Sequence, residues 1–181
     1  MTAADILFAP RGIVPGYNEE EPMKKVVAGV AAALLALSAL AAHAQVPVYG
    51  QSVNLEQAKK VIAAAQIEAN KNGWPVAIAV VDNAGMLVAY ERMDNTQTAS
   101  VLVAIDKATT AAMWRRPSKV FQDGVAGGGA GLRLLALRGV TPVDGGLPLV
   151  VDAKIIGAVG VSGVNADQDA MVAKAGADLL K

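Results

Sequence analysis

The pattern of apolar and polar positions predicts a helix at the start of the globular part of this chain. Apolar residues recur at spacings of three and four along residues 55–69, which is typical of an amphipathic helix. Asn54 and Gln57 have the spacing of an N-cap and its capping-box partner, and the pattern stops at Gly73. A second Asn-x-x-Gln start, at Asn165 and Gln168, predicts a C-terminal helix. Its expected buried stripe is Val172, Ala175 and Leu179.

Two pairs of short apolar segments predict β-hairpins. Residues 76–81 form an unbroken apolar run, typical of a strand that is buried on both faces. Residues 82–85 have turn chemistry, so residues 86–92 are predicted to return as the partner strand. Residues 147–151 and 155–161 form a second pair that turns at residues 152–154.

The region between the hairpins predicts a buried helix followed by a glycine-rich crossing. Residues 98–114 are apolar around most of the helix surface, which favours burial. Residues 124–146 contain 8 glycines in 23 positions, with residues 134–137 as a candidate short strand. Two local hairpins with helices packed on them predict an α+β layer fold built on an antiparallel sheet.

The N-terminal region has the pattern of an export signal. Lys24 and Lys25 precede an uncharged run of 15 residues, 26–40, and an Ala-x-Ala exit ends at Ala44. We therefore predict a signal peptide at residues 23–44, cleaved after Ala44, and a periplasmic or secreted product with no stable membrane span. Residues 1–22 are interpreted as a non-native upstream extension, and residues 45–181 as a single domain.

Composition and charge exclude several classes of function for the processed chain. Residues 45–181 carry a net charge of +1 and no cysteine, so neither a nucleic-acid-binding field nor a disulfide framework is expected. The chain's one histidine, His43, lies in the predicted signal peptide. Cleavage would leave neither imidazole nor thiol, and no metal site is predicted.

One set of residues has the chemistry of a ligand site. Arg92 ends a predicted strand, Lys107 and Thr110 share one face of a buried helix, and Gly145 and Gly146 open another strand. A buried lysine needs a partner or a polar pocket, and an arginine can bind a carboxylate with two hydrogen bonds. The alternative is an internal ion pair, Arg92 with Asp94 or Lys107 with Asp106, that only organises the fold.

The motifs resemble a known family. The strings VAIAVVDNAGMLVAYERMD and GGLPLVVDAKIIGAVGVSGVNADQD, with KATTAA and RPS between them, resemble the GlcG/HbpS-like haem-binding family and the C-terminal domain of PduO-type proteins. The resemblance covers residues 55–180. It implies a five-stranded antiparallel sheet flanked by helices in a profilin-like layering, assembly into homo-oligomers, and small-molecule or haem binding.

The resemblance also implies roles for individual residues. A threonine of the K-A-x-T-A helix contacts haem iron in one relative, and the matching residue here is Thr110. Other members use histidine ligands, which this domain lacks, so we expect any haem to be bound weakly and without histidine. Two alternatives stay open at this point: a small enzyme acting on an organic acid or aldehyde at Lys107 and Thr110, and an oligomeric scaffold with a vestigial pocket.

Overall fold

The computed structural model describes residues 46–180. The chain divides into two units, residues 1–45 and 46–181, and only the second is described here. The predicted extension, signal peptide and cleavage point therefore lie outside the described residues, as does His43. In chain order the elements are β1 (Val48–Tyr49), α2 (Leu55–Asn72), β2 (Ala77–Val81), β3 (Leu87–Arg92), α3 (Ser100–Trp114), α4 (Lys119–Ala126), the 3₁₀ helix η1 (Gly129–Ala136), β4 (Gly146–Val151), β5 (Lys154–Ser162) and α5 (Ala166–Asp178).

Strand β5 is the centre of a five-stranded sheet. β4 pairs with one edge of β5 and β2 with the other, both antiparallel, and β3 follows β2. Both predicted hairpins are confirmed, and Asp152 and Ala153 turn the second one with positive φ angles of 49° and 59°. One detail of the expected sheet is corrected: β1 runs parallel to β5, so the sheet is mixed. Most of the domain lies between β1 and β5 in the sequence, and no tight turn joins them, so nothing forces β1 to run antiparallel.

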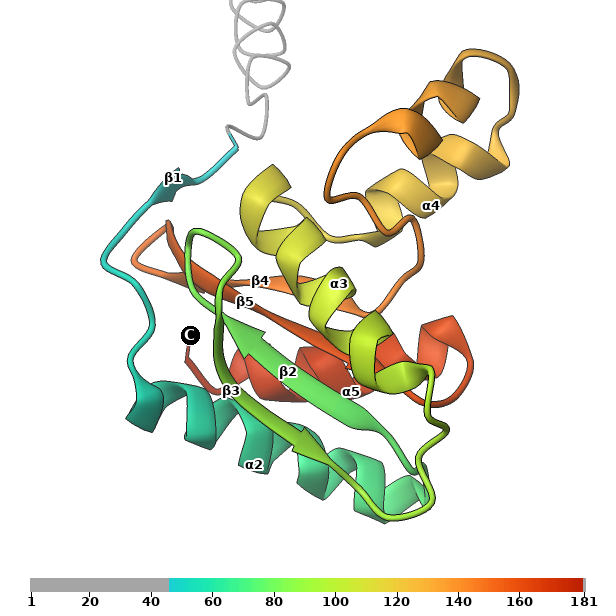
Figure 1. Cartoon of the computed structure of the whole chain (residues 1–181). Coiled ribbons are helices and arrows are strands. Elements are labelled where there is room, and N and C mark those ends of the chain that lie inside the picture. Colours follow the sequence, from blue (N-terminus) through green and yellow to red (C-terminus); the bar gives the residue numbers. More distant parts are fainter. Residues whose placement is uncertain (1–45, 181) are drawn as a thin grey trace, which may run out of the picture. The chain divides into compact units, whose positions relative to one another are not determined.

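Helices cover both faces of the sheet (Figure 1). α2 and α5 pack together on one face, over a core that includes Val61, Ile78 and Val172. α3 covers the other face, over a core made largely of alanines. β2 and β5 are buried on both sides, which explains their unbroken apolar runs. Within residues 46–180, no helix is both long enough and apolar enough to cross a membrane.

The predicted helix starts are confirmed. Asn54 and Gln57 exchange hydrogen bonds between side chain and backbone at the start of α2. Asn165 and Gln168 form the same arrangement at the start of α5. The expected stripe of α5 was partly wrong, because Leu179 lies beyond the helix and is 51% exposed.

The candidate strand at residues 134–137 was also wrong. This segment lies mainly in η1, which packs against α4 and has no buried residue. A strand needs a neighbour with free backbone groups, and here the chain instead folds back on α4 through closely packed glycines. A Cβ atom added to Gly131 would lie 1.9 Å from the Gly124 carbonyl oxygen, so this close return requires glycine.

Candidate functional site

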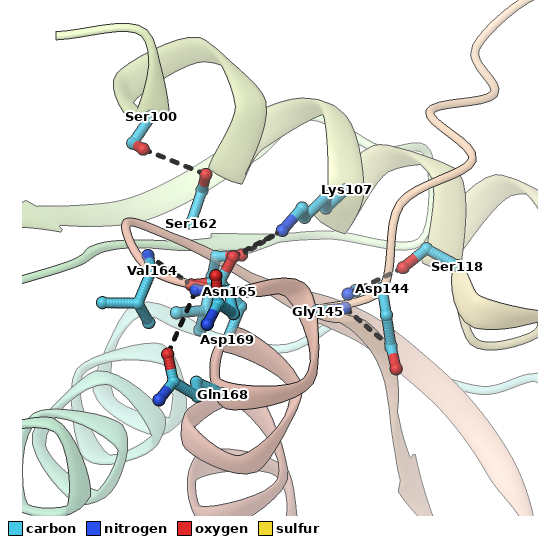
Figure 2. A network of polar contacts seen from close by, with 12 residues as sticks. Ser100, Lys107, Ser118, Asp144, Gly145, Ser162, Val164, Asn165, Gln168 and Asp169 are labelled. Carbon is cyan, nitrogen blue, oxygen red and sulfur yellow. Dashed lines mark hydrogen bonds and ion pairs between the residues drawn. The ribbon is translucent and has the colours of Figure 1, made fainter. Parts of the chain in front are cut away.

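Lys107 is the largest fully buried side chain in the described part of the protein. It points from α3 toward the start of α5, and only 1% of the residue is exposed (Figure 2). Its Nζ donates to Asp169 Oδ2 at 2.8 Å and to the Val161 carbonyl oxygen at 3.0 Å. The charge of Lys107 is therefore compensated inside the protein, by a residue that is distant in sequence.

Asp169, the partner of Lys107, was not among the site residues predicted from the sequence. Its second oxygen, Oδ1, accepts a hydrogen bond from the Val164 backbone at 3.1 Å. Burial raises the pKa of this carboxyl above its ordinary value of 3.8, against the opposing effect of the Lys107 hydrogen bond. The available signal was spacing: Asp169 lies on the buried stripe that continues through Val172, Ala173 and Gly176. The alternative pairing of Lys107 with Asp106 is not found, because Asp106 faces outward on α3.

Gly145 and Gly146 lie against Lys107. A Cβ atom on Gly145, which has φ of 115°, would lie 3.0 Å from Lys107 Nζ. One on Gly146 would lie 2.2 Å from the Lys107 carbonyl oxygen. The Gly146 amide donates to Ser118 Oγ at 2.9 Å, which fixes this approach. These three predicted residues therefore meet in direct contact and enclose no space for a ligand between them.

Thr110 is buried, and its hydroxyl forms hydrogen bonds with the glycine-rich loop. Its hydroxyl lies 2.8 Å from the Asp106 carbonyl oxygen and 3.2 Å from that of Gly139, and accepts a hydrogen bond from the Thr141 amide at 2.8 Å. It is fully enclosed by protein. Haem iron could reach the Thr110 oxygen only if residues 139–141 moved away.

Arg92 is placed apart from the other four predicted residues. It ends β3, which β2 separates from β5, and its guanidinium donates to the Thr96 carbonyl oxygen at 2.7 Å. Arg92 therefore binds the loop that leads to α3. The alternative pairing of Arg92 with Asp94 is not found. The sequence predicted one cluster of five residues, and the structure brings three of them, Lys107, Gly145 and Gly146, into contact.

Three cavities are described, and none is lined by the five predicted residues. One of about 320 Å³ lies between the β1–α2 connection and the β4–β5 turn. Another, of about 440 Å³, lies between α2 and the outer edge of β3. The third, of about 490 Å³, is an open apolar hollow formed by α2 and the C-terminal residues. Among residues 46–180, no group of three or more His, Cys, Asp or Glu side chains could hold a metal ion.

The C-terminal end of α3 presents a different kind of surface. Met113 is 50% exposed and lies between two loops: a Cβ atom on Gly85 would lie 3.5 Å from its Sδ, and one on Gly139 would lie 3.6 Å from it. Met86 and Leu87, which follow Gly85, are 65% and 49% exposed. We call these five residues, Gly85, Met86, Leu87, Met113 and Gly139, the Met113 surface.

Cationic and aromatic side chains border the Met113 surface. Tyr49 of β1 donates its hydroxyl to the carbonyl oxygens of Ala112 and Met113, at 2.9 and 3.2 Å. The Arg115 guanidinium lies 5.5 Å from the centre of the Tyr49 ring, a cation–π contact. Arg138 immediately precedes Gly139 and is exposed. An apolar surface bordered by guanidinium groups suits a flat molecule that carries carboxylates.

Fold and surface together define a small α+β layered domain with a mixed five-stranded sheet and an exposed apolar surface at the end of α3. Comparison with known proteins makes this more specific. The sequence model of the family described as "Haem degrading protein HbpS-like" matches residues 53–178, and the chain belongs to this family.

Individual relatives agree with that assignment. Protein GlcG of Escherichia coli (strain K12) is 46% identical over 107 residues, which are 59% of this chain and 78% of GlcG. The crystal structure of a double mutant of HbpS from Streptomyces reticuli has a TM-score of 0.67 at 30% identity, covering 74% of this chain and 90% of that one. The crystal structure titled "PduOC:Heme Complex" has a TM-score of 0.64 at 27% identity, covering 70% and 94%.

The side chains present can be tested against haem, the group that this family implies. Haem iron is held by His, Cys, Met or Tyr in proteins, and residues 46–180 contain neither His nor Cys. The hydroxyl of Tyr49 is engaged, and that of Tyr90 is buried. The Met113 surface offers a thioether, one of the donor types that hold haem iron, and Arg115 and Arg138 neighbour its residues in the chain, so the side chains present are compatible with haem.

Proposed function

We propose that this domain is an exported small-molecule-binding protein that takes haem or a related tetrapyrrole, weakly and without histidine ligation. The observation that carries the proposal is the Met113 surface, an exposed apolar area bordered by Arg115 and Arg138. Membership of the HbpS-like family and the likeness to a haem complex support the class of ligand.

The proposed binding mode follows from the charges and shape of this surface. The apolar side chains would cover part of a porphyrin face, and the two guanidinium groups would pair with its propionates. Both arginines are at the surface, so each pair contributes little and is screened by salt. Weak affinity that falls with ionic strength is therefore expected.

The alternative of an enzyme at Lys107 and Thr110 has less support. A proton-transferring lysine must reach its substrate, whereas Lys107 Nζ is enclosed by Asp169 and Val161. The Thr110 hydroxyl is enclosed in the same way. The described geometry favours structural roles for both side chains.

Haemin titration of residues 45–181 tests the proposed ligand class. We expect a saturable change in the Soret band without the low-spin spectrum of two nitrogen ligands. Arg138→Ala should weaken binding about two- to fivefold at low salt, as the loss of one exposed ion pair implies. Arg133→Ala, an exposed arginine of η1, is the matched control and should leave affinity unchanged. Absence of saturable binding would refute the proposal.

Export is tested separately, by N-terminal sequencing of the protein purified from its native host. The expected first residue is Gln45, the position after the Ala-x-Ala exit. An intact segment 23–44 on the purified protein would refute cleavage.

A further inference from the structure

We infer that the Met113 thioether is the side chain that contacts the iron of bound haem in this protein. This inference rests on the proposed function and names the donor at that site. It starts from a problem that the structure itself poses, since the threonine matched by sequence is enclosed and the domain holds no imidazole or thiol.

Thr110 is disfavoured as the iron ligand because its hydroxyl is already enclosed. Its hydroxyl is within hydrogen-bond distance of three backbone groups, and opening it would leave the Thr141 amide without its partner. Leaving a buried donor unsatisfied destabilises the protein. A neutral hydroxyl is in addition a weak iron ligand beside a thioether.

The other candidate iron donors differ in their exposure and in the hydrogen bonds that they already make. The Tyr49 hydroxyl already donates to α3, and the Tyr90 hydroxyl is buried with no partner in the described residues. Met171 is 52% exposed but lies on α5, which covers the opposite face of the sheet from α3. Met93 packs against the hydrophobic core that α2 and α5 cover. Met113 and Met86 remain, both on the Met113 surface.

Met113 is favoured over Met86 as the donor because neighbouring residues hold its side chain in place. α3 supplies a rigid backbone, and the contacts with Gly85 and Gly139 hold the thioether between two loops. Half of the Met113 residue is nevertheless exposed, so its side chain is both held in place and accessible from solvent. Met86 follows a turn and is more exposed, 65% against 50%.

A thioether donor has a consequence that a hydroxyl donor lacks. Sulfur of this type is a soft ligand and binds reduced iron in preference to oxidised iron, so it raises the reduction potential of the haem. The protein should therefore bind ferrous haem more tightly than ferric haem. Met113→Leu should remove that preference, because leucine has a similar volume and no sulfur.

The test uses residues 45–181 with haemin, before and after reduction by dithionite, followed by absorption and magnetic circular dichroism. For the unaltered protein we expect the charge-transfer signature of methionine–iron ligation and tighter binding after reduction. Met113→Leu should abolish the signature and lower ferrous affinity about tenfold, while the far-UV circular dichroism stays unchanged. Met171→Leu is the matched control, with the same substitution at the same exposure on the opposite layer.

The outcomes separate this inference from the proposed function. Haem binding with an unchanged spectrum in Met113→Leu would overturn the assignment of the donor and leave the proposed function standing. Loss of the signature in Met86→Leu but not in Met113→Leu would overturn it as well. No haem binding by the unaltered protein would refute the proposed function itself.

Discussion

The ammonium group of Lys107 carries a full charge at a place that water does not reach. An isolated buried charge is very costly, and Asp169 at 2.8 Å makes the site tolerable. Asp169→Asn should therefore destabilise the protein by about 3–5 kcal/mol, because it leaves the lysine charged with only a carbonyl oxygen and an amide nearby. Urea unfolding followed by circular dichroism measures this loss.

A double-mutant cycle with Lys107→Met shows whether the loss comes from the unpaired charge. Removing both charges should recover much of the stability lost in Asp169→Asn, since replacement of a whole buried pair is often nearly neutral. The control is the exposed pair Lys119 and Asp123, which has the same 2.8 Å separation and should show a coupling of only about 0.3–0.5 kcal/mol. Additive effects of the two buried substitutions would contradict this account.

The raised pKa of Asp169 is a second property of this buried pair that can be measured. Burial holds the pKa of this carboxyl above its ordinary value of 3.8 in the folded protein, against the opposing effect of the Lys107 hydrogen bond. We therefore expect Asp169 to titrate above that value.

Carboxyl carbon NMR of the folded protein measures that titration directly. The Asp169 midpoint should lie above 3.8, the ordinary value for an aspartate. A midpoint below 3.8 would show that the Lys107 hydrogen bond, and not burial, dominates.

At the scale of elements, the contact between α3 and β5 requires glycine at position 160 of β5. A Cβ atom on Gly160 would lie 2.1 Å from the Ala104 carbonyl oxygen and 2.4 Å from the Ala108 amide nitrogen. The helix backbone thus rests directly on the strand backbone, with small residues on both sides. This close contact also brings Lys107 within reach of Val161 on β5 and of Asp169.

Gly160→Ala should therefore push α3 away from the sheet. We expect a loss of 1–3 kcal/mol or more, as overpacking of a core produces, together with weaker protection of the Lys107 region in hydrogen exchange. Gly127→Ala at the end of α4 is the control: its φ of −68° suits alanine, and the nearest atom to an added Cβ is 3.5 Å away. Equal effects of the two substitutions would argue against direct backbone packing.

At the scale of the whole molecule, an exposed apolar area favours assembly with other copies. Ile67 of α2 is 71% exposed and Leu179 is 51% exposed, and both border the hollow of about 490 Å³. Contiguous apolar surface of this kind is typical of interfaces, and symmetric homo-oligomers are the common outcome. A domain without disulfides would gain stability from burying it.

Light scattering coupled to size-exclusion chromatography measures the assembly. At micromolar concentration we expect a mass of at least two copies, and Ile67→Lys should reduce it by placing a charge in the interface. Leu102→Lys, at a residue 68% exposed on α3, is the matched control and should leave the mass unchanged. A monomer at every concentration would contradict the expectation of a homo-oligomer.

The sequence by itself determined the local elements of this domain. The capping boxes at Asn54 and Asn165, the turn at Asp152, and the unbroken apolar runs of β2 and β5 are local signals, set by interactions among neighbouring residues. The motif strings in addition identified the family, and with it the layered α+β fold. These predictions held because short-range spacing fixes what a segment can form.

Tertiary structure alone decided which polar groups meet. Lys107 and Asp169 are 62 positions apart, and no local pattern pairs them. The same holds for Thr110 with Thr141 and for Met113 with Gly85 and Gly139, whose contacts depend on how the loops cross α3. The sequence showed that a buried lysine needs a partner, which is a matter of solvation, but the choice of partner and the exposure of Met113 depend on the packing of helices against a sheet that forms from distant segments.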